Sequence, residues 1–148
     1  IHEKTNVLYS IGIATQATIT DKILIVYGDL VFNEHAIKGI VGDESKIVVD
    51  NNGHMDKREV GLVCEKNEIK NFSFGLEKKW SQIAYLCGKE LSLFKDVCCS
   101  KDTSQWFGYE ALNRVIENEG NLFGFSNKKM KIVEIDIAKD LNKLKLLS

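Results

Sequence analysis

The clearest hydrophobic pattern is a run without a polar face, from Lys22 to Phe32 (KILIVYGDLVF). The residues Ile23–Tyr27 are all aliphatic or aromatic, which is typical of a strand covered on both faces. Gly28 interrupts the run, and Asp29 follows directly. In open α/β sheets, ligands bind just beyond the carboxyl ends of the strands. Asp29 is therefore a candidate for holding a metal ion or a sugar hydroxyl, with a plain Gly-Asp turn as the alternative.

Helical and strand periodicities alternate along the rest of the chain. Amphipathic or capped segments predict helices over residues 6–18, 33–41, 89–97, 105–118 and 137–147, and apolar or alternating runs predict strands over 46–50, 60–64, 68–74, 82–87, 122–125 and 131–135. The strands 60–64 and 68–74 flank a short turn, so we expect an antiparallel hairpin. This mixture predicts one continuous α/β domain over residues 1–148, built as a three-layer, Rossmann-like mixed sheet.

Composition narrows the partners more than the fold. The chain has 148 residues, 44% of them hydrophobic and 28% charged, which is ordinary for a globular domain with a core. Its formal net charge of −1 gives no electrostatic case for nucleic acid or for an anionic membrane surface. No apolar run is long enough to cross a bilayer. We therefore expect no nucleic-acid partner and no membrane.

The four cysteines are Cys64, Cys87, Cys98 and Cys99. Their spacing is not that of a zinc site, and the adjacent Cys98 and Cys99 cannot readily bridge each other. We expect all four thiols to be reduced, with Cys64 and Cys87 buried in apolar strands. Reduced thiols predict a cytoplasmic protein.

A second carboxylate stands at the end of a late apolar strand, in the sequence VEIDIAKDL (Val133–Leu141). The strand is expected to end at Asp136 and a helix to begin at once. Asp136 is well placed as the N-cap of that helix. Capping alone accounts for this residue, and the motif by itself is too short to indicate more.

Four segments together resemble the nucleotidyltransferase family. They are NVLYSIGIA (Asn6–Ala14), ILIVYGDLVF (Ile23–Phe32), SKIVVDNN (Ser45–Asn52) and VEIDIAKDL (Val133–Leu141). They occur in the family's order and spacing. More narrowly, they are similar to the cytidylyltransferase branch that acts on choline phosphate and on phosphonates, including members partnered with phosphoenolpyruvate phosphomutase. The resemblance implies a fold of the nucleotide-diphospho-sugar transferase type.

The resemblance also implies a metal site. In that family, the aspartate of the Gly-Asp pair and the aspartate closing the late strand jointly hold Mg²⁺; the matching residues are Asp29 and Asp136. Asp50, at the end of IVVD, matches a position near the acceptor substrate. Mg²⁺ typically takes one or two carboxylates together with substrate phosphates. The implied reaction is attack of a small phosphorylated or phosphonylated acceptor on a nucleoside triphosphate, with CTP expected, and release of pyrophosphate.

Weaker candidates come from the same resemblance. Asn6 and Ser10 match residues that reach the nucleotide base or phosphates, although an N-cap and a helix-face serine explain them nearly as well. Trp106 and Tyr109 fall where the family often has an aromatic residue at the acceptor pocket. Trp106 is a candidate for stacking on a choline-like or aminoethyl cation, against the alternative that both rings belong to the core. Arg58 is a candidate contact for an anionic acceptor, or a solvated turn residue.

One departure from the family is large. The family carries a glycine-rich loop with a basic residue, G-x-G-x-R, which cradles the nucleotide phosphates, and no such sequence occurs in the chain. We therefore expect residues 1–148 to be the later two-thirds of an N-terminally truncated catalytic domain and to be inactive alone. The alternatives are a degenerate, non-catalytic homologue, and a sugar-1-phosphate nucleotidyltransferase or glycosyltransferase of the same fold. Such glycosyltransferases usually carry two aspartates flanking one residue, unlike Gly28–Leu30 here.

These motifs give one geometric expectation. The strands that end at Tyr27, Asp50 and Ile135 should lie in one sheet, because each leads directly to a carboxylate or ends in one. Asp29 and Asp136 should then stand side by side at its carboxyl edge, within reach of a single ion.

Overall fold

A computed structural model describes residues 7–51, 57–103, 105–106, 108–135 and 138–147. With η marking 3₁₀ helices, the elements are α1 (Val7–Gln16), β1 (Lys22–Val26), β2 (Leu30–Phe32), η2 (Glu34–Ala36), β3 (Ser45–Asp50), β4 (Val60–Glu65), β5 (Glu68–Phe74), β6 (Lys78–Cys87), α2 (Gly88–Cys99), η3 (Lys101–Thr103), α3 (Gly108–Glu117), β7 (Leu122–Phe125), β8 (Ile132–Glu134) and η4 (Ala138–Leu147). The predicted α/β class is confirmed.

Six strands form a mixed sheet in the order β1-β6-β3-β7-β5-β4. The long strand β6 pairs antiparallel with both β1 and β3, so these two strands run parallel to each other. Val26 near the end of β1 pairs with Ile83, and Asp50 at the end of β3 pairs with Lys79. The carboxyl ends of β1 and β3 therefore meet at one edge of the sheet, as expected for Tyr27 and Asp50.

The hairpin prediction is also confirmed. β4 and β5 pair antiparallel, and their turn places Lys66 and Asn67 at φ 50° and 65°, the left-handed conformation of a tight hairpin turn. The helices α1 and α2 and the strands β3 and β7 also lie where the periodicity predicted them. α3 begins at Gly108 instead of residue 105, and β6 begins at Lys78 instead of residue 82.

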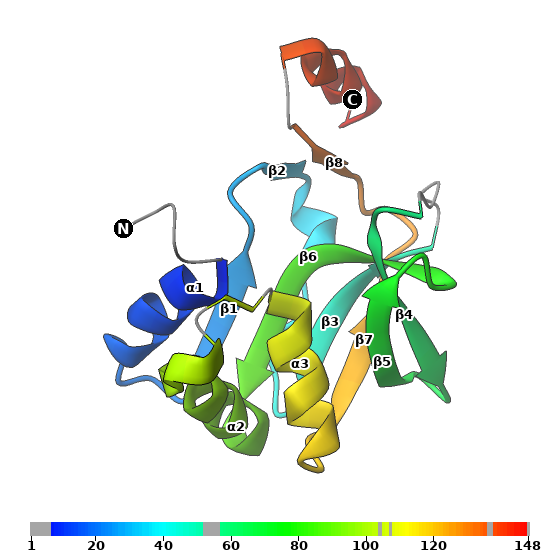
Figure 1. Ribbon diagram of the computed structural model, residues 1–148. Coiled ribbons are helices and arrows are strands. Elements are labelled where there is room, and N and C mark those ends of the chain that lie inside the picture. Colours follow the sequence, from blue (N-terminus) through cyan, green and yellow to red (C-terminus); the bar gives the residue numbers. More distant parts are fainter. Residues whose placement is uncertain (1–6, 52–56, 104, 107, 136–137, 148) are drawn as a thin grey trace.

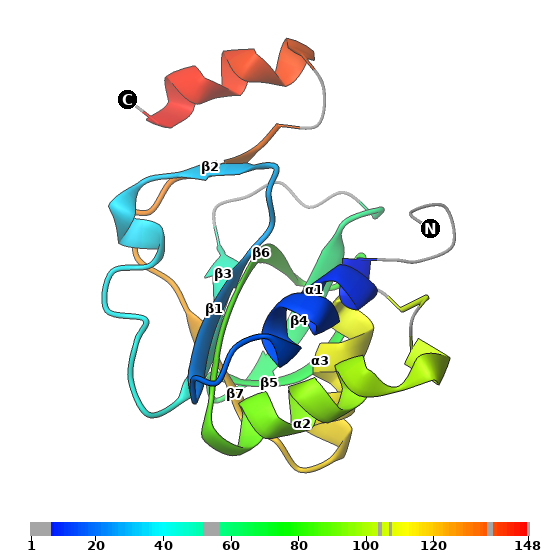
Figure 2. The same cartoon turned by 90° about the vertical axis from the view of Figure 1, so that its left-hand side faces the viewer.

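The α-helices all cover one face of the sheet (Figures 1 and 2). On that face, residues from the helices and the sheet form the larger core; its buried members include Leu8, Phe72, Phe94, Leu112 and Leu122. The smaller core on the opposite face joins Ala36 and Ile40 to Ile83, Tyr85 and Met130.

The predicted three-layer sandwich is therefore not what the described residues form. The second face is covered by η2 and the irregular chain around it, where a helix over 33–41 was expected. The helix stops after one turn because Gly39 takes φ 84°, a left-handed conformation that ends helical pairing. Asn33 does not cap it: its side chain instead bonds the backbone of Lys129 and Lys131.

β1 also differs from its prediction. In the described part of the chain it pairs with β6 alone, at the edge of the sheet. Ile23 and Ile25 pack against the larger core, whereas Leu24 and Val26 remain 40% and 38% exposed. An unbroken apolar run thus belongs to an edge strand with one open face, because hydrophobic sequence alone does not distinguish which faces are covered.

β8 lies outside the main sheet. It pairs antiparallel with β2 in a separate two-stranded ribbon, with Leu30 opposite Glu134 and Phe32 opposite Ile132. The ribbon lies above the main sheet, and η4 follows it (Figure 1). The expectation that the strand ending at Ile135 joins the strands of Tyr27 and Asp50 in one sheet is wrong.

All four cysteines are free, as expected. Cys87 is buried as expected, but Cys64 is only partly buried because it lies on β4, at the end of the strand order of the sheet, so that part of the prediction is wrong. Cys98 is partly buried and Cys99 is exposed. Among the described residues, no helix combines the length and apolar character needed to cross a bilayer.

Candidate functional site

The Gly-Asp turn and the end of β8 are joined by the backbone. Beyond β1, the chain turns so that the Leu30 amide approaches the Tyr27 carbonyl at 3.4 Å. The Ile135 amide donates a hydrogen bond to the carbonyl oxygen of Asp29 at 2.8 Å. The late strand therefore ends at the turn that carries Asp29, even though the two strands belong to different sheets. Asp136, the residue after Ile135, lies outside the described residues, so the pairing of its carboxylate with that of Asp29 stays a prediction.

A bulge in β6 faces this turn. Ile47 pairs with Ala84 and Val49 with Trp80, so β6 carries extra residues between the two pairs. The indole N–H of Trp80 donates to the carbonyl of Ile83 at 3.3 Å and braces the bulge. Within it, Gln82 takes φ 60°, in the left-handed region that favours glycine. Because the bulge breaks the alternation of side chains, the consecutive residues Lys79 to Gln82 all line one pocket.

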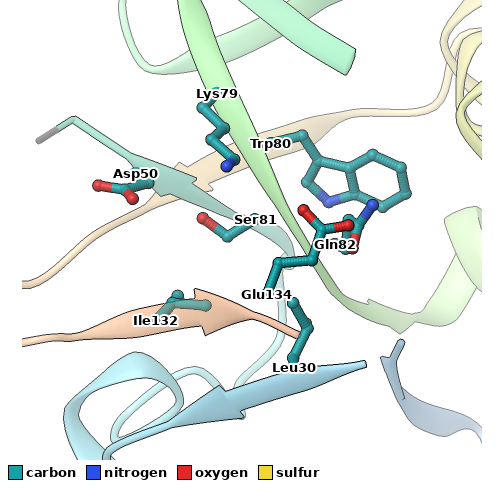
Figure 3. A pocket seen from close by; sticks show the side chains of 8 residues that line it. All are labelled: Leu30, Asp50, Lys79, Trp80, Ser81, Gln82, Ile132 and Glu134. Carbon is teal, nitrogen blue, oxygen red and sulfur yellow. The ribbon is translucent and has the colours of Figure 1, made fainter. Parts of the chain in front are cut away.

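A cavity of about 210 Å³ opens beside the bulge. Its lining residues are Val7, Tyr27, Arg58, Glu59, Val60, Phe74, Lys79, Trp80, Gln82, Tyr109 and Glu134. A smaller pocket of about 20 Å³ shares four of these residues and adds Leu30, Asp50, Ser81 and Ile132 (Figure 3). Because they share these residues, the two pockets adjoin each other, and together we call them the cleft; it lies between β6, the ends of β1 and β3, and β8.

Aromatic rings make one wall of the cleft. Tyr27 and Trp80 contact each other edge to face, with ring centroids 5.5 Å apart, and Phe74 and Tyr109 do so at 5.4 Å. Burial, with the nearby Asp29 charge, raises the pKa of Tyr27 to about 12, against the effect of a backbone hydrogen bond with Gly108. Tyr27 is thus a neutral wall of the cleft at physiological pH.

Charges of both signs line the other walls. Lys79 forms an ion pair with Glu59 at 3.1 Å, and both side chains line the larger cavity with Arg58. Asp50 and Glu134 stand on opposite sides of the smaller pocket (Figure 3). A cleft with rings, two cations and several carboxylates suits a small, polar ligand that carries charge.

Three residues singled out from sequence line this cleft. Asp50 lines the smaller pocket, and Arg58 and Tyr109 line the larger cavity. Asp29 itself lies between Tyr27 and Leu30, which line the two parts of the cleft. The ends of β1 and β3, which lead to Asp29 and Asp50, thus lie at one edge of the sheet, while the roles of both residues stay predictions.

Other candidates are not brought to the cleft. Trp106 packs against the larger core and lines neither pocket, and the guanidinium of Arg114 lies over one face of its ring at 5.1 Å. Ser10 lies on an exposed part of α1 and lines a separate apolar groove between α1 and β1. The position of Asn6 lies outside the described residues, and its role stays a prediction.

Sequence analysis did not predict the contribution of β6 to the cleft. The predicted strand began at residue 82, whereas β6 begins at Lys78. Trp80 and Ser81 were therefore assigned to the connection after the hairpin, and Gln82 only to the first position of the strand. Their one signal is the sequence KKWSQ, in which a lone tryptophan is flanked by polar residues. A bulge cannot be read from periodicity, because it breaks the alternation on which the strand prediction rests.

The donor set fits a hard cation. Asp29 supplies a carboxylate at the end of a strand, which is the ligand chemistry that Mg²⁺ prefers. Within the described ranges, no three His, Cys, Asp or Glu side chains form a metal cage. Mg²⁺ needs no such cage, since it usually keeps several waters and completes its shell with substrate phosphates. The metal role of Asp29 and Asp136 stays a prediction.

Comparison with known proteins assigns the fold. Sequence comparison finds no family model and no curated protein that matches. The fold, in contrast, is similar to solved structures of nucleotidyltransferases: an inositol-1-phosphate CTP transferase from T. maritima (TM-score 0.78, 18% identity) and a CTP:phosphocholine cytidylyltransferase from Streptococcus pneumoniae (TM-score 0.76, 13% identity). A Bacillus anthracis protein described as a glucose-1-phosphate thymidylyltransferase gives a TM-score of 0.74 at 13% identity.

The coverage of these similarities is unequal. The T. maritima and B. anthracis matches each span 97% of this chain and 61% of the other protein. The S. pneumoniae match spans 99% of this chain and 66% of the other protein. At these identities the likeness establishes the fold. The activity must be argued from the residues of the cleft.

Proposed function

We propose that this domain takes part in nucleotidyl transfer, in which a small phosphorylated or phosphonylated acceptor attacks the α-phosphate of a nucleoside triphosphate and pyrophosphate leaves. CTP is the nucleotide we favour. The observation that carries the proposal is the hydrogen bond between Ile135 and Asp29, because it joins the two segments that lead to Asp29 and Asp136 beside a cleft of suitable size.

In this proposal, Asp29 and Asp136 would hold Mg²⁺, whose charge would stabilise the negative charge that develops on the α-phosphate. The acceptor binds in the cleft. Arg58 and Lys79 are the cations of its lining, and they attract the acceptor's phosphate or phosphonate group. Asp50 lines the smaller pocket, next to the larger cavity in which the acceptor binds. Positioning supplies most of the rate, since phosphoryl-group chemistry asks little covalent work of the protein.

The neutral aromatic wall has a defined part in this arrangement. Tyr27 and Trp80 give the acceptor a rigid, apolar surface on one side, which excludes water from the charges on the other. Because burial holds the Tyr27 pKa near 12, its hydroxyl acts neither as a base nor as an anion at neutral pH. Tyr27 therefore positions the acceptor and does not exchange protons with it.

Nucleotide turnover tests this proposal. Pyrophosphate release is measured with CTP, ATP, GTP and UTP, each with Mg²⁺ and either phosphocholine or 2-aminoethylphosphonate. The complete open reading frame is compared with residues 1–148. We expect turnover with CTP by the complete protein and none by residues 1–148, which carry no G-x-G-x-R loop to grip the triphosphate.

Two results would change this account. Turnover by residues 1–148 alone would mean that the triphosphate is held by residues we have not identified. No turnover by the complete protein with any nucleotide would favour the non-catalytic homologue.

A further inference from the structure

Two neighbouring residues of the β6 bulge, the buried Ser81 and the partly buried Gln82, each have a shielded oxygen atom that lacks a partner. The Ser81 hydroxyl oxygen and the Gln82 Oε1 atom are shielded from solvent, and neither makes a hydrogen bond within the described part of the chain. Ser81 is only 3% exposed. Buried polar groups are nearly always hydrogen-bonded, because an unmet group costs stability. Both residues line the smaller pocket, and Gln82 also lines the larger cavity, so a ligand bound in the cleft lies next to them (Figure 3).

The backbone at Gln82 supports a role for its side chain. At φ 60° a residue with a Cβ atom is strained, whereas glycine is not. Strain of this kind persists where the surrounding structure imposes it, and it gathers at binding sites. Glycine would satisfy the backbone at lower cost. The carboxamide is what glutamine adds at this position.

The chemistry of the pocket selects the partner. The carboxylates of Asp50 and Glu134 accept hydrogen bonds, the Ser81 hydroxyl accepts or donates, and the Gln82 carboxamide accepts through Oε1 and donates through its nitrogen. Lys79 adds a cation, which forms an ion pair with Glu59. The two atoms without partners are both oxygens that accept hydrogen bonds, so a ligand that satisfies both brings N–H or O–H donors.

We propose that Ser81 and Gln82 bind the head group of the acceptor substrate through hydrogen-bond donors on that group, either a primary ammonium or hydroxyls. The proposal rests on the function above, because it takes the cleft as the acceptor site. A trimethylammonium head group has no N–H donor and leaves both buried oxygens without partners. The pocket therefore discriminates against fully N-methylated acceptors, in the way a site built for a hydroxyl or amine rejects an analogue without one.

Calorimetric titration of the complete protein tests this directly. The probes are phosphoethanolamine and phosphocholine, which differ only in three N-methyl groups, and glycerol 3-phosphate, which offers hydroxyls in place of the ammonium. We expect phosphoethanolamine or glycerol 3-phosphate to bind at least about tenfold more tightly than phosphocholine. Tighter binding of phosphoethanolamine would identify an ammonium group as the hydrogen-bond donor, and tighter binding of glycerol 3-phosphate would identify hydroxyl groups.

Two variants assign the effect to these side chains. Ser81→Ala and Gln82→Gly should each reduce the preference to about twofold or less, without lowering the melting temperature, because they remove an unpaired group and backbone strain. Glu119→Gly is the matched control, since Glu119 also takes a left-handed conformation (φ 68°) but does not line the cleft. It should leave the preference unchanged.

Three results overturn the proposal: equal or tighter binding of phosphocholine, a preference that survives both variants, or no binding of any probe, which would mean that the pocket holds only water. Pyrophosphate release from CTP on the same samples separates this claim from nucleotidyl transfer. Equal turnover of phosphocholine and phosphoethanolamine rejects the subsite and keeps the activity. Donor-dependent binding with no turnover of any nucleotide rejects the activity and keeps the subsite.

Discussion

The amide of Ile135 donates a hydrogen bond to the Asp29 carbonyl at 2.8 Å, and this contact brings a late strand to the turn after an early one. The two strands do not share a sheet: β1 pairs with β6, and β8 pairs with β2. The chain reaches the same point through the short ribbon β2–β8, which begins directly after the Gly-Asp turn. The turn that carries Asp29 is therefore fixed from both sides, by β1 before it and by β8 across from it.

Gly108 should be sensitive to the smallest substitution. A Cβ atom at Gly108 would overlap the Tyr27 hydroxyl and lie 3.7 Å from the Trp80 ring. Gly108→Ala should therefore displace Tyr27 and lower the free energy of unfolding by about 1 to 3 kcal/mol, as overpacking does. Urea denaturation measures the change. Gly28→Ala is the control, because no atom lies within 4 Å of its added Cβ; an equal loss in both variants would contradict this account of Tyr27.

Tyr27 should also govern stability at high pH. Its pKa is about 12 in the folded protein and about 10 in the unfolded chain. The folded state thus retains a proton that the unfolded state loses, so this contribution is fully present below pH 10 and is lost as the pH rises toward 12. The loss is about 1.4 kcal/mol per pH unit in that window.

Spectroscopic titration and Tyr27→Phe together isolate the effect. The wild-type protein should show one tyrosine ionising well above the others, followed as phenolate absorbance, and Tyr27→Phe should lack it. The variant should also lose less free energy of unfolding between pH 10 and 12 than the wild type. The same decline in both proteins would mean that Tyr27 is not the group responsible.

The cysteines should differ in reactivity. Cys99 is exposed, whereas burial, with the adjacent Cys99 charge, raises the pKa of Cys98 to about 12. Thiolates are the reactive form, so a disulfide reagent at about pH 8 should modify Cys99 first and Cys98 slowly. Mass spectrometry of digested protein identifies the labelled residue. A disulfide in the untreated protein, seen as a mass shift on reduction, would contradict the assignment of four free thiols.

Sequence predicted most elements of this fold because their patterns are local. The hairpin of β4 and β5 and the helix α2 each carry their own periodicity and turn residues. β1 was predicted to be buried on both faces, but one face is exposed. Its exposed residues, Leu24 and Val26, are as apolar as its core-facing residues, Ile23 and Ile25, so sequence alone does not distinguish the two faces. Which strand pairs with which is set by contacts distant in sequence, and periodicity does not contain them.

Sequence predicted candidate residues only where they follow strand ends. Asp29 and Asp50 were candidates because a carboxylate after an apolar run is visible in sequence, and Asp50 does line the smaller pocket. Ser81 and Gln82 were missed because their role depends on a bulge and on a pocket wall contributed by Glu134. Trp106 was chosen for its aromatic ring, but the ring stacks with Arg114, a pairing that the helix creates.

The central claim is that Asp29 and Asp136 hold one ion, and a double-mutant cycle on the complete protein tests it. Turnover is measured for Asp29→Asn, Asp136→Asn and the double variant, with the exposed Asp43→Asn as control. If both residues bind the same Mg²⁺, each single change should lower kcat by about 10²-fold or more, and the double change should cost little beyond either one. Losses that multiply would indicate independent roles, and unchanged turnover in either single variant would contradict the shared metal site.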